Sequence, residues 1–259
     1  MPEIIFSIII PFIGTVLGSA LVYIFKDKIS DSVLKAFSGF AAGVMIAASI
    51  WSLIIPSFDA SASKGNLAFL PVLIGLLVGF IFLMILDKLI PHMHTNSEET
   101  EGIRCSLPRS IMTSIAVALH NLPEGMAVGI VLASSQAGNS VVSISMAIAL
   151  AIGIAIQNFP EGAIVSVSLN STGTNKHKSF LLGVLSGIVE PIGALLTFLL
   201  VNLITPTLPY LLSFAAGAML YVVVEELIPE MSNGKHSHIG TICFIVGFSM
   251  MMVLDFLLG

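Results

Sequence analysis

A six-residue motif at positions 120–125, His-Asn-Leu-Pro-Glu-Gly, lies in the middle of a long apolar segment. His120 and Glu124 are four residues apart, so on a helix they share one face, and Asn121 stands three residues before Glu124. Pro123 has no N–H to donate inside a helix, so it is expected to kink the helix and free the carbonyl of Leu119. An imidazole, an amide and a carboxylate at this spacing are suitable donors for half of a cation site.

A second motif at positions 157–162, Gln-Asn-Phe-Pro-Glu-Gly, repeats the pattern in the next apolar segment. Gln157 and Glu161 again share one face, and Asn158 precedes Glu161 by three residues. Pro160 is expected to kink this helix and free the carbonyl of Ile156. Two kinked helices that each carry a carboxylate and polar neighbours predict one cation site built from two halves.

The composition indicates where such helices reside. The 259 residues are 56% hydrophobic and 10% charged, with a mean hydropathy of +1.03. Soluble domains are about one quarter charged, so this chain has too little polar surface for a soluble protein of its size. Its apolar runs of about 20 residues suit membrane helices rather than barrel strands of about ten residues. The chain is therefore expected to be an all-α integral membrane protein.

Eight apolar runs are long enough to cross a bilayer, and the whole chain, 1–259, is interpreted as one transmembrane domain. The runs cover about residues 4–25, 34–55, 67–90, 108–133, 141–169, 180–203, 208–229 and 239–258. An even number of spans places both termini on the same side of the membrane.

The basic residues indicate which side that is. If both termini are extracytoplasmic, nine of the ten lysines and arginines fall in the cytoplasm and only Lys64 falls outside. Positive charges concentrate in cytoplasmic loops. We therefore expect a multi-pass protein of the cell membrane with both termini extracytoplasmic.

An internal repeat is visible in two spans that cross in opposite directions. Residues 40–46, Phe-Ala-Ala-Gly-Val-Met-Ile, resemble residues 214–220, Phe-Ala-Ala-Gly-Ala-Met-Leu. This predicts an inverted repeat of spans 1–3 and 6–8 around a central pair, spans 4–5, an arrangement typical of secondary transporters with a midplane site. A chance match between helices rich in small residues is the alternative.

Four ionisable side chains stand near the middle of their spans: His120, Glu124, Glu161 and Glu190. Ionisable groups at this depth are costly and usually functional. No lysine or arginine lies at the same depth, so we expect a bound metal ion to supply the counter-charge. A lone buried glutamate such as Glu190 could instead be protonated and hydrogen-bonded.

The donor types narrow the choice of metal. One imidazole with carboxylate and amide oxygens suits Zn²⁺, Fe²⁺, Mn²⁺ or Cd²⁺ better than Cu⁺ or Mg²⁺. One or two ions are expected per chain, because Glu124 and Glu161 each face two donors and could bridge a pair. Met45 in span two could add a soft ligand or simply fill the core.

Polar residues outside the span centres have weaker interpretations. The longest connection, about 91–107, is expected to be a cytoplasmic, mobile loop whose His92 and His94 either hold a cation weakly or belong to a solvated linker. Asp59, in the outer loop after span two, could attract cations or be an ordinary loop acid. Three glutamates near the cytoplasmic end of span seven could form an exit route or be merely solvated: Glu225, Glu226 and Glu230.

The paired motif resembles the signature of the ZIP (Zrt/Irt-like) metal transporters, in the prokaryotic GufA-type branch. Eight spans, outward termini and a histidine-bearing loop after span three also match, so the resemblance covers the whole chain. It implies uptake of divalent metal, chiefly zinc, into the cytosol through an elevator-like movement of the site-bearing helices. The partners it implies are divalent metal ions, the lipid bilayer and a second copy of the chain, with no nucleic acid.

The resemblance also implies a ligand set. One metal position would use Met45, His120, Glu124, Gln157 and Glu161. A second position would use Asn121, Glu124, Asn158, Glu161 and Glu190. Glu226 would belong to the release path and Asp59 to the entrance. Gln157 stands where many relatives have histidine and Asn158 where a close branch has aspartate, which leaves the metal preference and the second position open.

An intramembrane metal-dependent hydrolase is the alternative function, because histidine, glutamate and a bound metal can activate water. The chain has no His-Glu-x-x-His motif and no obvious spare general base, so we expect a transporter and not an enzyme. The chain also lacks a midplane lysine or arginine, which an organic solute carrier would need to bind an anionic substrate. The absence of a Gly-x4-Gly-Lys-[Ser/Thr] loop argues against direct use of ATP.

Overall fold

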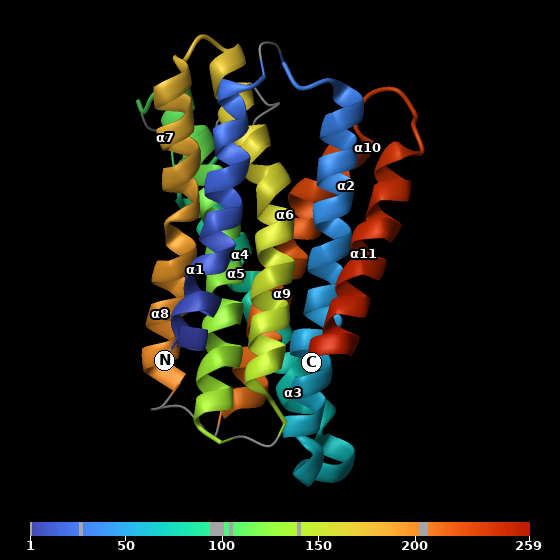
Figure 1. Ribbon diagram of the computed structural model, residues 1–259. Helices are drawn as coiled ribbons and strands as arrows, with labels where there is room; N and C mark the ends of the chain where they lie inside the picture. The colour runs from blue at the N-terminus through green and yellow to red at the C-terminus, as the bar shows by residue number, and fades with distance from the viewer. Residues whose placement is uncertain (1, 26–27, 94–100, 104–105, 139–140, 202–206) are drawn as a thin grey trace.

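A computed structural model describes the chain except for residues 1, 26–27, 94–100, 104–105, 139–140 and 202–206 (Figure 1). Within the described residues, eight helical spans are long and apolar enough to cross a membrane. The same residues form no β-strand, only an isolated bridge between His92 and Glu101. The predicted all-α architecture with eight spans is confirmed.

The helices have the following bounds. In chain order they are α1 (Pro2–Ser19), α2 (Asp31–Ala48), α3 (Ile55–Ala60), α4 (Phe69–Leu89), α5 (Arg109–Gln136), α6 (Ile144–Ser171), α7 (Lys176–Gly187), α8 (Val189–Val201), α9 (Leu208–Val222), α10 (Ile228–Ser232) and α11 (Ile239–Leu258). A 3₁₀ turn, η1 (Ala20–Tyr23), ends the first span, and another, η3 (Ala62–Leu67), precedes α4. Two π-helical stretches, η2 (Ser49–Ile54) and η5 (Val223–Leu227), join α2 to α3 and α9 to α10.

Side-chain caps begin several of these helices where the sequence changes from polar to apolar. The Ser143 side chain accepts a hydrogen bond from the Met146 backbone N–H at 3.0 Å, which begins α6. The Asn175 side chain accepts one from the Lys178 N–H at 2.8 Å, which begins α7. Such caps satisfy N–H groups that have no partner within the helix. They help to fix where α6 and α7 begin.

Two span boundaries differ from the predicted ones by more than three residues. The second span runs to Ala60 rather than about 55, because the chain continues through η2 into α3 with Pro56 in the first turn, where a missing N–H costs little. Asp59 therefore lies exposed on a helix rather than in a loop. The sixth span starts at Lys176 rather than about 180.

The motif prolines do not end their helices. Pro123 lies inside α5 and Pro160 inside α6, and both helices continue through their prolines without a break. The sixth span is the one that breaks, at Ile188 between α7 and α8. Glu190 consequently stands in the first turn of α8, where Pro191 fits without loss of a hydrogen bond.

Glycines allow the helices to approach backbone to backbone in two groups. The first group, which we call the site bundle, consists of α1, α5, α6, α7 and α8. A Cβ added at Gly14 of α1 would lie 2.1 Å from the Ala155 carbonyl oxygen of α6, and one at Gly129 of α5 would lie 2.2 Å from the Ala194 carbonyl oxygen of α8. Only glycine permits these contacts.

The second group, the frame bundle, consists of α2, α3, α4, α9, α10 and α11. Its two main helix pairs, α2 with α11 and α4 with α9, lie side by side along most of their length. In each pair both helices contribute a glycine that meets a carbonyl oxygen of the other helix. The glycine–carbonyl pairs are Gly43 with Phe244, Gly247 with Phe40, Gly217 with Leu76 and Gly79 with Phe214.

An apolar cluster of mostly small side chains lies between the two bundles. Its members include Ala127, Val128 and Val131 of α5, Ala147, Leu150 and Ala151 of α6, Ala41 and Met45 of α2, and Ala215 and Met219 of α9. The close glycine approach across this boundary is Gly153 of α6, whose added Cβ would lie 2.2 Å from the Met251 Sδ of α11, a flexible side chain. Among the described residues, the helices therefore interlock less closely across this boundary than inside either bundle.

Candidate metal centre

The two motif helices carry their polar side chains into the interior of the site bundle. Asn121 and Glu124 of α5 and Gln157 and Asn158 of α6 are all at most 1% exposed. Glu190 of α8 is likewise buried, and Gly125 allows the approach, because a Cβ there would lie 2.2 Å from the Glu190 carbonyl oxygen. We call these five residues the carboxylate–amide cluster.

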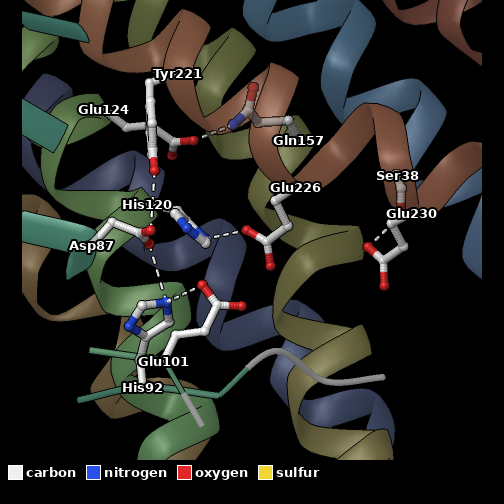
Figure 2. Close-up of polar contacts among 10 residues, drawn as sticks. All are labelled: Ser38, Asp87, His92, Glu101, His120, Glu124, Gln157, Tyr221, Glu226 and Glu230. Carbon is white, nitrogen blue, oxygen red and sulfur yellow. Dashed lines mark hydrogen bonds and ion pairs between the residues drawn. The ribbon is translucent and has the colours of Figure 1, made fainter. Parts of the chain in front are cut away.

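Hydrogen bonds fix the orientation of several side chains in this cluster. Gln157 donates from Nε2 to Oε1 of Glu124, which joins the two motif helices (Figure 2). Asn121 donates from Nδ2 to the Ser186 carbonyl oxygen at 3.1 Å. Because the amide nitrogens are used as donors, the amide oxygens of Asn121 and Gln157 are left as acceptors.

Several buried oxygens in this cluster have no hydrogen-bond partner among the residues that the structure describes. They are Asn121 Oδ1, Glu124 Oε2, Gln157 Oε1, Asn158 Oδ1 and Glu190 Oε2. The side chain of Asn158 lies beside the carboxyl groups of both Glu124 and Glu190, so oxygens from three helices face one region. A buried polar atom without a partner is costly. Carboxylate and amide oxygens in this arrangement fit a divalent cation, which would satisfy them together.

His120 and Glu161 face a neighbouring cavity rather than the centre of that cluster. The cavity has a volume of about 30 Å³ and is lined by His120, Glu161, Glu226 and Glu230, with Ser38 and apolar side chains. His120 Nδ1 forms an ion pair with Oε2 of Glu226, and Ser38 donates to Glu230 at 2.7 Å (Figure 2). We call these four ionisable residues the cavity cluster.

The Glu161 carboxyl group lies close enough to both clusters to interact with them electrostatically. Its carboxyl group lies near that of Glu124, near that of Glu190 and near those of Glu226 and Glu230. Several carboxylates in a poorly solvated region repel one another strongly unless cations lie among them. The arrangement therefore favours cations among these carboxyl groups.

Most of the predicted ligands are thus brought together. Asn121, Glu124, Gln157, Asn158 and Glu190 form one cluster, and His120, Glu161 and Glu226 form the other. Met45 is fully buried within the apolar cluster between the bundles, and its role as a ligand stays a prediction. The predicted pairing of His120 with Glu124 on one helix face is compatible with helix geometry, but the described partner of His120 is Glu226.

Sequence reasoning missed the neutral side chains that hold these ligands. Thr15 of α1 donates from Oγ1 to Oε1 of Glu190 at 2.8 Å, and the Ser186 carbonyl holds Asn121. A hydroxyl in an apolar span carries no distinguishing pattern, since other buried hydroxyls, such as those of Ser114 and Ser134 on α5, bond only to a carbonyl of their own helix.

A third polar group lies where the chain leaves α4. His92 is fully buried, with Nε2 3.1 Å from Asp87 Oδ1 and 4.0 Å from Glu101 Oε2, and Tyr221 donates to Asp87 Oδ2 at 3.0 Å (Figure 2). Of the two alternatives, the solvated linker does not fit His92, because Asp87 and Glu101 hold its ring inside. One atom from each of Asp87, His92 and Glu101 lies within 4.8 Å of the others, close enough for one metal ion. Cation binding by this loop stays a prediction, and His94 lies outside the described residues.

Comparisons with known proteins agree with this architecture. The family described as ZIP Zinc transporter matches residues 92–255, more than half of the chain. The zinc transporter ZIP11 of Bos taurus is 33% identical over 95% of this chain and 94% of its own length. The zinc transporter GufA of Myxococcus xanthus is 34% identical over 95% of this chain and 96% of its own, and the zinc transporter ZupT of Chlorobaculum parvum is 33% identical over 95% and 93%. The chain is therefore a multi-pass membrane transporter, not an enzyme, and belongs to the ZIP family of zinc transporters, which includes the GufA type.

Proposed function

We propose that this chain carries divalent transition metal ions, chiefly zinc, across the cell membrane into the cytosol, with the whole chain acting as one transport domain. The observation that carries the proposal is the set of five buried oxygens without partners in the carboxylate–amide cluster. A divalent ion offers the charge and the coordination that these oxygens lack. Names of relatives with similar sequences, all zinc transporters, support zinc as the main cargo.

Two ion positions are the finer part of this proposal. One lies in the carboxylate–amide cluster, and the other lies toward the cavity cluster, where His120 adds a nitrogen donor. Imidazole and carboxylate together suit Zn²⁺, Cd²⁺, Fe²⁺ and Mn²⁺. We propose that cadmium, iron and manganese compete with zinc, and that Glu124 and Glu161 bridge the two positions.

The charged ends of the helices support the proposed orientation in the membrane. Among the described residues, every lysine and arginine except Lys64 lies where the α1–α2, α4–α5, α6–α7 and α10–α11 connections are, at the top of Figure 1. We call this the basic end and propose that it faces the cytoplasm, with both termini outside. The cavity cluster, with Glu226 and Glu230 toward this end, then forms the release path.

The packing supports an elevator movement. The glycine–carbonyl contacts named above each stay inside one bundle, the bonds Thr15–Glu190 and Asn121–Ser186 stay inside the site bundle, and Ser52–Asp255 stays inside the frame bundle. The His120–Glu226 pair crosses the boundary and would have to separate in such a movement. The boundary between bundles consists mainly of small apolar side chains. Repacking such a boundary costs less than separating interlocked backbones, so we propose that the site bundle moves along the frame bundle as a unit.

The matching glycine contacts of α2 with α11 and of α4 with α9 also support an inverted repeat. In both halves the repeated segment, around Gly43 and Gly217, leads into a π-helical stretch and then an Ile-Pro step. We propose that the frame bundle arose from this repeat and supports two related end states. A homodimer, which the family resemblance implies, completes the proposal.

Zinc flux into proteoliposomes that contain a trapped zinc indicator tests this function. The wild-type chain should fill the vesicles with zinc, and Glu124→Ala should not. Ser134→Ala is the matched control, because Ser134 is buried on the same helix but bonds only to the Ile130 carbonyl. Equal flux in Glu124→Ala and the control would disprove the proposed site.

A further inference from the structure

The first span reaches the carboxylate–amide cluster through one neutral side chain. Thr15 of α1 donates a hydrogen bond from Oγ1 to Oε1 of Glu190 at 2.8 Å. Both residues are at most 1% exposed, and they are 175 positions apart in the chain. A buried hydrogen bond to a carboxylate is among the stronger kinds in proteins. The contact is therefore a specific feature of the fold and not an incidental surface contact.

This bond gives the two carboxyl oxygens of Glu190 different roles. Oε1 accepts from Thr15, whereas Oε2 is buried and has no partner. A threonine is branched at Cβ, so few rotamers are available to it and its hydroxyl direction is well defined. Held at one oxygen, the carboxyl group cannot turn freely, and it stays beside the Asn158 side chain with Oε2 buried.

Glycines on two neighbouring helices make room for Thr15 at this place. A Cβ added at Gly187, the last residue of α7, would lie 2.8 Å from Thr15 Cβ and 3.1 Å from Glu190 Oε1. A Cβ added at Gly162 of α6 would lie 2.4 Å from the Thr15 carbonyl oxygen. The threonine is thus fixed at a junction of α1, α6 and α7, and it cannot shift without repacking all three.

We propose that Thr15 is a positioning residue for metal binding, which holds Glu190 so that its second oxygen faces the ion. The inference rests on the proposed function. It assigns α1 a part in the metal centre, although α1 contributes no ionisable ligand. It also predicts that α1 moves with the motif helices, because losing contact with Glu190 would loosen the site.

Zinc binding to the purified full-length chain, measured by equilibrium dialysis with radioactive zinc, tests this role. Thr15→Val keeps the shape but removes the hydroxyl, and Thr15→Ser keeps the hydroxyl. Loss of an outer-shell partner usually weakens metal affinity about 10–100-fold, so we expect that loss in Thr15→Val and near-normal affinity in Thr15→Ser. Thr15→Ala, which also lacks the hydroxyl but is smaller, should repeat the loss if the valine variant cannot be purified.

Thr113→Val is the matched control, because Thr113 is a buried threonine of α5 whose hydroxyl bonds only to the Arg109 carbonyl at 3.1 Å. The decisive arm combines Thr15→Val with Glu190→Ala. If Thr15 acts through Glu190, the double variant binds zinc no more weakly than Glu190→Ala alone.

Two results would overturn the inference while leaving the transporter intact. One is unchanged zinc affinity in Thr15→Val when the wild type binds and moves zinc. The other is an added loss in the double variant equal to the loss in Thr15→Val alone, which would show that the two residues act independently. Failure of the wild-type chain to bind zinc at all would overturn the proposed function, and this inference with it.

Discussion

Gln157 donates a hydrogen bond from its amide nitrogen to Glu124, and this bond joins the two helices that carry the repeated motif. It leaves one oxygen on each residue buried and without a partner. The same contact therefore sets the register of α5 against α6 and leaves two buried oxygens free to bind the same ion. Ligand geometry and helix packing are thus coupled at this point.

Removing the charge of Glu124 should stop transport. In Glu124→Gln the side chain keeps its length, but an amide cannot offset the charge of a divalent ion. We expect zinc flux at the level of empty liposomes, with normal expression and elution from a sizing column. Flux near that of the wild type would remove Glu124 from the metal centre.

Removing the imidazole of His120 should change selectivity. His120→Ala loses the nitrogen donor of the cavity cluster and separates Glu226 from its partner. We expect the apparent KM for zinc to rise about tenfold, which corresponds to about 1.4 kcal/mol of binding free energy. Competition should shift toward manganese, which favours oxygen ligands. Glu225→Gln serves as the control, because Glu225 is exposed next to Glu226. An unchanged order of metals would contradict the role of His120.

A cross-link between the bundles should stop an elevator. Gly153 and Met251 face each other across the boundary, so cysteines at both positions, in a chain whose Cys105 and Cys243 are replaced by serine, should form a disulfide. Oxidation should abolish zinc flux, and reduction of the same sample should restore it. Full flux in the oxidised, cross-linked protein would show that the bundles need not slide.

Filling a glycine contact inside the frame bundle should cost stability. A Cβ at Gly43 would lie 2.1 Å from the Phe244 carbonyl oxygen, so Gly43→Val must push α2 and α11 apart. Overpacking of this kind costs about 1–3 kcal/mol, and we expect a lower Tm in detergent. Ala62→Val, at an exposed position of η3, should melt like the wild type. An unchanged Tm in Gly43→Val would contradict the close packing of α2 on α11.

The proposed orientation can be read by labelling intact cells with a membrane-impermeant thiol reagent. Asn66→Cys lies at the end opposite the basic end and should react from outside. Ser237→Cys, in the α10–α11 connection, should react only after the membrane is permeabilised. The reverse pattern would invert the proposed direction of transport.

Much of the fold was predictable because each membrane span can be recognised from its own hydropathy, without knowledge of the other spans. The eight spans follow from apolar runs that must each cross a bilayer. The extension of span two through η2 to Ala60 was not predictable, because a π-helical stretch has no sequence signature of its own. The burial of His92 was not predictable for a different reason. Its burial depends on Asp87 and Glu101, and only the folded connection brings those partners around its ring.

The candidate site was predictable to the level of a helix face. The spacing of His120 and Glu124 predicts that both point the same way, and both are buried. It does not predict that His120 meets Glu226, since that contact depends on where α5 lies against η5. The contact of Thr15 with Glu190 could not be predicted, because the two residues lie on spans far apart in the chain and hydroxyls in apolar spans are common.

Anomalous diffraction from crystals of the full chain soaked in zinc or cadmium tests the central claim most directly, since it reports the metal and its position together. The account predicts a strong peak about 2.0–2.2 Å from a Glu124 oxygen, with amide oxygens of the carboxylate–amide cluster around it. A second peak near His120 and Glu161 would establish two positions. Peaks confined to Asp87, His92 and Glu101, with none at Glu124, would contradict it.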